Sequence, residues 1–107
     1  MVFQLGSGLL DACVLAILNH EDTYGYVLTQ NVKGVVDISE STLYPVLRRL
    51  QKEESLVTYD KEFSGRNRRY YQITDQGRDK LKMYCTEWKN YKENIDHILE
   101  GGRNDVS

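Results

Sequence analysis

The chain contains few of the residues from which catalytic and metal sites are built. It has only two histidines and two cysteines in 107 residues, and neither cysteine stands at a metal-ligand spacing. It has no Ser/His/Asp grouping, no glycine-rich phosphate loop and no carboxylate pair suited to acid–base catalysis. The sequence therefore predicts a protein that is not an enzyme and that uses neither a metal nor another cofactor.

Few prolines, few cysteines and the absence of a long apolar run also limit the kind of protein this can be. The chain has one proline, and its apolar residues, 40% of the total, are spread evenly, which argues against disorder. The apolar run 9–18 includes Asp11 and is too short to cross a bilayer, and no basic segment precedes it as in a signal peptide. Cys13 and Cys85 are expected to be free thiols in a reducing compartment. We therefore expect one small cytoplasmic protein with no membrane partner.

The periodicity of the apolar residues predicts a mainly helical protein with one small β-hairpin. Spacings of three and four residues predict helices, and two runs rich in β-branched and aromatic residues predict strands joined by turn residues 64–67. The predicted helices cover residues 9–18, 24–32, 39–53 and 75–100, and the predicted strands cover residues 56–63 and 68–74. This order is typical of a winged helix-turn-helix followed by a long helix.

Capping residues define the predicted helix boundaries. Gly34 suits a left-handed residue at the end of the second helix, whereas Ser39 and Thr74 suit the N-caps of the third and last helices. Pro45 lies about one turn into the third helix, where its missing N–H costs little. We therefore predict one third helix, with room for a kink at this residue.

The predicted last helix carries an apolar stripe that indicates a dimer. Its members follow one another at steps of three and four residues, the a/d pattern of a coiled coil, and are Leu81, Tyr84, Trp88, Tyr91, Ile95 and Ile98. We divide the chain into a winged DNA-binding domain (1–74), a C-terminal dimerisation helix (75–100) and a flexible tail (101–107). Two-fold symmetry would place two recognition helices about one DNA turn apart, so the operator is expected to be an inverted repeat.

Basic charge is concentrated where a winged helix would meet DNA. Residues 48–70 hold seven basic and four acidic residues, a net charge of +3, whereas the rest of the chain has a net charge of −5. Hydroxyl groups at the start of the third helix can meet base edges, and arginines of the helix and the wing can meet phosphates. The predicted DNA contacts are Ser39, Ser41, Thr42, Tyr44, Arg48, Arg66, Arg68 and Arg69.

Not every basic side chain of this region is expected to touch DNA. Alternation along the strand should send Arg68 and Arg69 to opposite faces, so that only one of the two faces DNA. Arg49 and Lys52 are expected on the solvated surface or paired with the adjacent glutamates.

These motifs resemble those of the PadR family of bacterial transcriptional regulators. The resemblance covers about residues 5–100, and the single C-terminal helix is similar to that of the smaller subgroup, which includes multidrug-sensing repressors. It implies that Tyr24 joins the DNA contacts. It rests on Tyr24-Gly25-Tyr26, on Ser41-Thr42-Leu43-Tyr44-Pro45 with Arg48-Arg49-Leu50, on Gly65-Arg66 and Arg69-Tyr70-Tyr71 of the wing, and on Thr74 with Gly77.

The resemblance also implies a homodimeric repressor that leaves double-stranded DNA when a small aromatic or phenolic effector binds. Trp88 falls where the drug-sensing members carry a tryptophan that lines a pore at the dimer centre. Two alternatives stay open: Trp88 only anchors the dimer interface, or the protein is a winged-helix interaction module that does not bind DNA. The residues expected around the effector are Leu5, Gly8, Asp11, Ala12, Leu15, Trp88, Tyr91 and Ile95.

Overall fold

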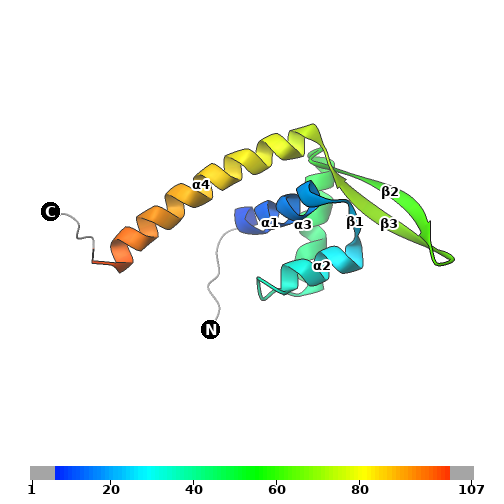
Figure 1. Ribbon diagram of the computed structural model, residues 1–107, viewed down its shortest axis with the longest axis horizontal. Helices are drawn as coiled ribbons and strands as arrows, with labels where there is room; N and C mark the ends of the chain where they lie inside the picture. Colours follow the sequence, from blue (N-terminus) through cyan, green and yellow to red (C-terminus); the bar gives the residue numbers. More distant parts are fainter. Residues whose placement is uncertain (1–6, 102–107) are drawn as a thin grey trace.

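The protein contains four helices and a three-stranded antiparallel sheet, and all its elements except the short strand β1 follow one another in the predicted order (Figure 1). The computed structural model describes residues 7–101. Its elements are α1 (Ser7–His20), β1 (Thr23–Tyr24), α2 (Gly25–Lys33), α3 (Glu40–Lys52), β2 (Leu56–Phe63), β3 (Arg66–Ile73) and α4 (Asp75–Leu99). The predicted fold class, a winged helix-turn-helix with a long C-terminal helix, is confirmed.

The hydrophobic core lies where the first three helices meet the sheet. The apolar stripe predicted for α3, which includes Leu43 and Leu47, is buried, whereas Tyr44 and Arg48 on the other side of the helix are exposed. The core residues are Val14, Leu15, Leu18, Leu28, Val32, Leu43, Val46, Leu47, Leu50, Leu56, Ile73 and Leu81. Because the core covers one side of α3, the other side is left to meet solvent or a partner.

Local hydrogen bonds define both ends of α3. The side-chain oxygen of Ser39 accepts a hydrogen bond from the backbone N–H of Thr42, which confirms the predicted N-cap. The helix continues through Pro45, as predicted. It ends in a Schellman arrangement, in which Glu54 is left-handed (φ 64°) and the N–H of Ser55 donates to the carbonyl of Leu50.

The sheet differs from the prediction in two places. Its strand order is β1-β3-β2, so the hairpin gains a third strand, β1, which has only two residues and was not predicted. The turn contains two residues, Ser64 and Gly65, with φ values of 53° and 78°, as a type I′ turn requires. The second strand was predicted over residues 68–74, whereas β3 begins at Arg66 and ends at Ile73.

Gly34, at the end of α2, has a right-handed φ of −69°, so its predicted left-handed conformation was wrong.

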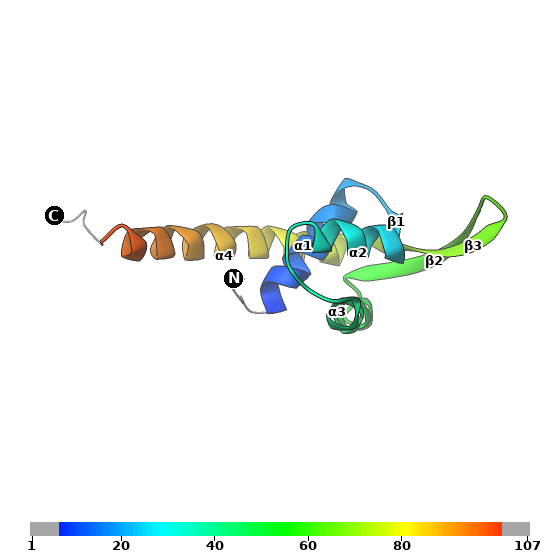
Figure 2. The same ribbon diagram turned by 90° about the horizontal axis from the view of Figure 1, so that it is seen from below.

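The last helix extends away from the body of the protein. Figures 1 and 2 show α4 running from the sheet along α1 and then past it, in the direction opposite to the wing. Thr74 caps the helix through the backbone N–H of Gly77, as predicted (3.0 Å). Within α4, only Gly77 and Leu81 are buried. The predicted tail begins at Gly101, and its other residues lie outside the described part of the chain.

Candidate nucleic-acid interface and the adjoining groove

The N-terminus of α3 presents a cluster of exposed hydroxyl groups. The Ser39 hydroxyl lies 2.9 Å from that of Ser41 and 3.1 Å from that of Thr42. All three residues are exposed, and they are held at the positive end of the helix dipole. Hydroxyl groups both donate and accept hydrogen bonds, so this tip can meet either base edges or phosphate oxygens.

Two exposed arginines flank the same tyrosine beside α3. Burial raises the pKa of Tyr71, and the positive charges of Arg69 and Arg48 partly offset this rise. The Tyr44 hydroxyl is also close, since a Cβ added to Gly25 would lie 3.6 Å from Cε1 of Tyr71 and 4.0 Å from that hydroxyl. Arg48 of α3 and Arg69 of β3 therefore lie on one side of the molecule, and we call Tyr44, Arg48 and Arg69 the basic face.

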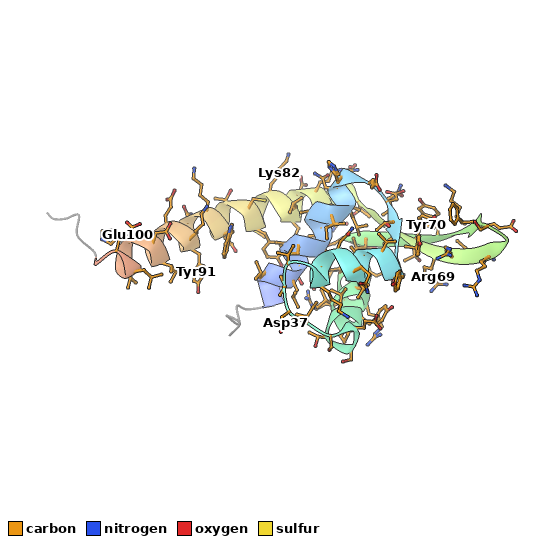
Figure 3. The ribbon with its side chains drawn as sticks, turned by 60° about the horizontal axis from the view of Figure 1, so that its bottom comes forward. Asp37, Arg69, Tyr70, Lys82, Tyr91 and Glu100 are labelled. Carbon is orange, nitrogen blue, oxygen red and sulfur yellow. The ribbon has the colours of Figure 1, made fainter. Side chains whose placement is uncertain are left out.

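Arg68, the neighbour of Arg69 in the wing, lies on the other face of the sheet. The guanidinium carbon of Arg68 is 4.4 Å from the centre of the Tyr24 ring and 5.7 Å from that of Phe63. Tyr24 in turn meets the edge of Tyr70 at 5.5 Å. Figure 3 shows Tyr70 and Arg69 pointing to opposite sides of β3. The predicted DNA contacts are therefore not all on one side. Tyr24 and Arg68 lie on the face of the sheet that carries Tyr70, which we call the outer face, and Arg66 is exposed at the tip of the wing.

A third arginine, Arg49, has a role that sequence reasoning missed. Its guanidinium donates two hydrogen bonds to the carboxylate of Asp11 in α1, at 3.0 Å and 2.5 Å, and also pairs with Glu53 at 3.5 Å. Asp11 is 2% exposed and also accepts a hydrogen bond from the Tyr84 hydroxyl of α4 at 2.8 Å. The predicted pairing of Arg49 with an adjacent glutamate is confirmed for Glu53, whereas its main partner, Asp11, was not predicted. Asp11 joins three helices.

An open groove of about 640 Å³ runs between α1 and α4. Of the residues expected around an effector, Gly8, Ala12, Trp88 and Tyr91 line it. The groove also contains residues that were not predicted there: Leu9, Cys13, Ala16, Leu81, Tyr84, Cys85 and Glu87.

The remaining predicted effector residues lie elsewhere. Leu15 is fully buried in the core, and Asp11 is turned to Arg49 and Tyr84. Ile95 is half-buried farther along α4 and is not part of the groove wall. Leu5 lies outside the described residues.

The position of Tyr84 makes its hydroxyl a weaker acid than that of an ordinary tyrosine. Burial first, and then the hydrogen bond to Asp11, raise the pKa of Tyr84 to about 12. Because the unfolded side chain ionises near pH 10, this group contributes stability that is complete below about pH 10 and is lost between about pH 10 and 12. In an absorbance titration at alkaline pH, Tyr84→Phe should remove one of the last tyrosines to ionise. If the variant loses only an early step, this hydrogen bond does not form in solution.

Comparison with known proteins identifies the family. A model described as "Transcriptional regulator PadR-like family" matches residues 14–83. The chain belongs to this family. Three relatives agree over most of their length. The crystal structure of smu.1704 from Streptococcus mutans is 40% identical with a TM-score of 0.89, covering 99% of this chain and 100% of that one.

The other two relatives are named as regulators. The PadR-like transcriptional regulator BC4206 from Bacillus cereus is 34% identical with a TM-score of 0.82, covering 89% of this chain and 95% of that one. Transcriptional regulator Rv3488 of Mycobacterium tuberculosis is 34% identical over 93 residues, 83% of each chain. The PadR-like family consists of transcriptional regulators and not of enzymes.

In the part of the PadR-like chain that the structure describes, no group of His, Cys, Asp or Glu is arranged to hold a metal. Within residues 7–101, no helix is both long and apolar enough to span a membrane.

Proposed function

We propose that the protein is a homodimeric repressor that binds double-stranded DNA and is released by a small aromatic effector. The observation that carries the proposal is the exposed side of α3, where Ser41, Tyr44 and Arg48 follow one another at spacings of three and four residues. Arg69 of β3 lies near the same side, since its charge and that of Arg48 both act on Tyr71. The hydroxyl groups are suited to base edges, and Arg48 and Arg69 are suited to the flanking phosphates. Within this family, such an arrangement makes α3 the recognition helix and the hairpin the wing.

The far part of α4 supports the dimer. Trp88 is 41% exposed, Tyr91 47% and Ile98 68% in the single chain, although their apolar surface is of the kind that normally becomes buried. They follow the a/d spacing of a coiled coil, so a second copy of α4 can cover them. The two-fold axis of such a dimer makes the operator an inverted repeat.

The groove supports the effector. Its wall combines small residues of α1 with the rings of Tyr84, Trp88 and Tyr91 from α4. A volume of about 640 Å³ lies within the usual range for small-molecule sites. In the dimer, the second α4 would close the open side, so that a flat aromatic molecule becomes enclosed between rings.

The test is operator binding by the purified protein over a series of salt concentrations. We expect tight binding to an inverted repeat near its own promoter, with affinity falling steeply as salt rises. Arg69→Ala should weaken binding to all sequences several-fold and reduce the salt slope by about 1. Thr42→Ala should instead change which base pairs are preferred. An aromatic ligand that quenches the single tryptophan, Trp88, should release the DNA.

The matched control is an exposed lysine outside the basic face. Lys82 of α4 lies away from Arg69 in Figure 3, and Lys82→Ala removes the same charge. It should leave the salt slope close to that of the wild type. Equal effects of the two changes would show that DNA responds to net charge only, and no binding at low salt would favour the winged-helix interaction module.

A further inference from the structure

A hydrogen-bonded network connects the groove to the recognition helix. The ring of Tyr84 forms part of the groove wall, and its hydroxyl donates to the carboxylate of Asp11. The same carboxylate accepts two hydrogen bonds from Arg49 of α3. The helix that carries the apolar stripe and the helix that carries the hydroxyl cluster therefore share one buried acceptor.

We propose that Asp11 is the positioning residue through which occupancy of the groove changes the setting of α3 on DNA. The proposal rests on the proposed function, since it names the route by which an effector would act. A ligand in the groove would contact Tyr84, the Tyr84 hydroxyl would change its hydrogen bond to Asp11, and Asp11 would change its hydrogen bonds to Arg49 of α3.

Burial makes Asp11 suited to this role. Asp11 is 2% exposed, so the loss of one hydrogen-bond partner costs its carboxylate more free energy than it would at an exposed position. The bidentate geometry also ties Arg49 to one orientation of the carboxylate, because the planar guanidinium forms two parallel hydrogen bonds. A rotation of the carboxylate therefore breaks or redirects the two hydrogen bonds that hold Arg49 of α3 against α1.

Close packing makes Tyr84 a suitable input. Its ring lies against the backbone of α1, since a Cβ added to Gly8 would be 3.6 Å from Cε1 of Tyr84. The ring is also packed against the hydrophobic core, so a ligand that enters the groove pushes on a ring that is held in place. The hydroxyl then has to leave Asp11 or pull the carboxylate with it, and either result changes what Arg49 binds.

A second connection between α4 and α3 lies nearer the surface. Lys80 of α4 forms an ion pair with Glu53, the C-cap residue of α3, and Glu53 also contacts Arg49. Glu53 is exposed, and exposed pairs of this kind transmit little energy because solvent screens them. The experiment must distinguish this surface pair from the buried route through Asp11.

The experiment measures operator affinity with and without a neutral fluorescent probe, N-phenyl-1-naphthylamine, at a saturating concentration. In the wild-type dimer, the probe should weaken operator binding by about tenfold, and the operator should weaken probe binding by the same factor. In Tyr84→Phe, which keeps the ring but lacks the hydroxyl, this factor should fall to about 1. A hydrogen bond with a purely structural role would change both affinities alike and leave the factor as it was.

Two further variants serve as controls. Tyr59→Phe removes a similar hydrogen bond, 2.7 Å from the Tyr59 hydroxyl to Asp22, on the outer face of the sheet, and should keep the wild-type factor. Lys80→Met removes the ion pair with Glu53 and should keep most of the wild-type coupling factor. Arg49→Lys, which retains the charge but not the bidentate geometry, should reduce the factor as Tyr84→Phe does.

Several results would overturn the proposal. They are a Tyr84→Phe variant that couples like the wild type, a loss of coupling in Lys80→Met alone, and a probe that does not bind or does not affect the operator. The first two results leave DNA binding and release by the probe intact, so they refute the route alone. The third result also counts against release by an aromatic effector, although DNA binding itself stays intact. If the wild-type protein shows no salt-dependent operator binding at all, the proposed function fails and the route fails with it.

Discussion

Arg49→Met should lower the free energy of unfolding by about 3 kcal/mol, the low end of what breaking a buried ion pair costs. Asp11 is 2% exposed, and within the described residues the change leaves its carboxylate with the Tyr84 hydroxyl as its one hydrogen-bond partner. Methionine keeps much of the apolar stem of arginine, so the loss reports mainly the missing charge. We place the cost at the low end because the Arg49 side chain is 39% exposed and some water can reach the site. Urea unfolding at a fixed protein concentration measures it.

The neighbouring arginine provides the control for this measurement. Arg48 is exposed, and the described residues give it no ion pair. Arg48→Met should therefore change stability by no more than about 0.5 kcal/mol, although it should weaken DNA binding. In a background of Asp11→Asn, which removes the buried charge, Arg49→Met should cost much less. Equal destabilisation by the two arginine changes would contradict the assignment of Arg49 to a buried pair.

The two arginines also show where sequence reasoning reaches its limit. Periodicity predicted that Leu43, Val46, Leu47 and Leu50 would be buried, because a helix that packs on a core must repeat its apolar residues every three or four positions. It could not identify the partner of Arg49, because Asp11 is 38 residues away on another helix. Glu53, four residues along the chain at the C-cap of α3, was the partner visible in the sequence, and it is the weaker one.

The wing shows the same division. Alternation predicts that Arg68 and Arg69 lie on opposite faces, since successive side chains in a strand point in opposite directions. Which of the two shares a face with α3 depends on the pairing of β3 and on Tyr71, which packs against the core. The two-residue strand β1, which fixes that pairing from the other edge, is too short to have a recognisable period.

The groove was half predictable for a related reason. The stripe of α4 has one apolar side, so its spacing correctly brought Trp88 and Tyr91 into one wall. α1 is apolar around most of its circumference, and its sequence does not show which side faces the core. Leu15, which the family resemblance placed around the effector, lies in the core, whereas Leu9 and Cys13 line the groove.

The start of α4 depends on the absence of a side chain at Gly77. This residue is buried, and a Cβ added there would lie 2.3 Å from the carbonyl oxygen of Ser55 and 2.7 Å from Cγ1 of Ile73. The Ser55 oxygen cannot easily move, because it accepts a hydrogen bond from the backbone N–H of Thr74 at 3.1 Å. Thr74 is the N-cap of α4, so the same contact holds the helix to the end of α3.

Gly77→Ala should therefore destabilise the protein by about 2 to 3 kcal/mol, the cost of overpacking against backbone, even though alanine favours a helix by about 1 kcal/mol. Gly34→Ala is the matched control. Gly34 has a φ of −69°, and an added Cβ would meet its nearest atoms, the carbonyl oxygens of Gln30 and Asn31, at 3.5 Å and 3.6 Å. This change should be neutral or stabilise by up to about 1 kcal/mol. Thermal unfolding of both variants at equal concentration separates the outcomes. Similar unfolding temperatures would mean that α3 and α4 are not held together at Ser55, and that the network around Asp11 is the main contact between these two helices.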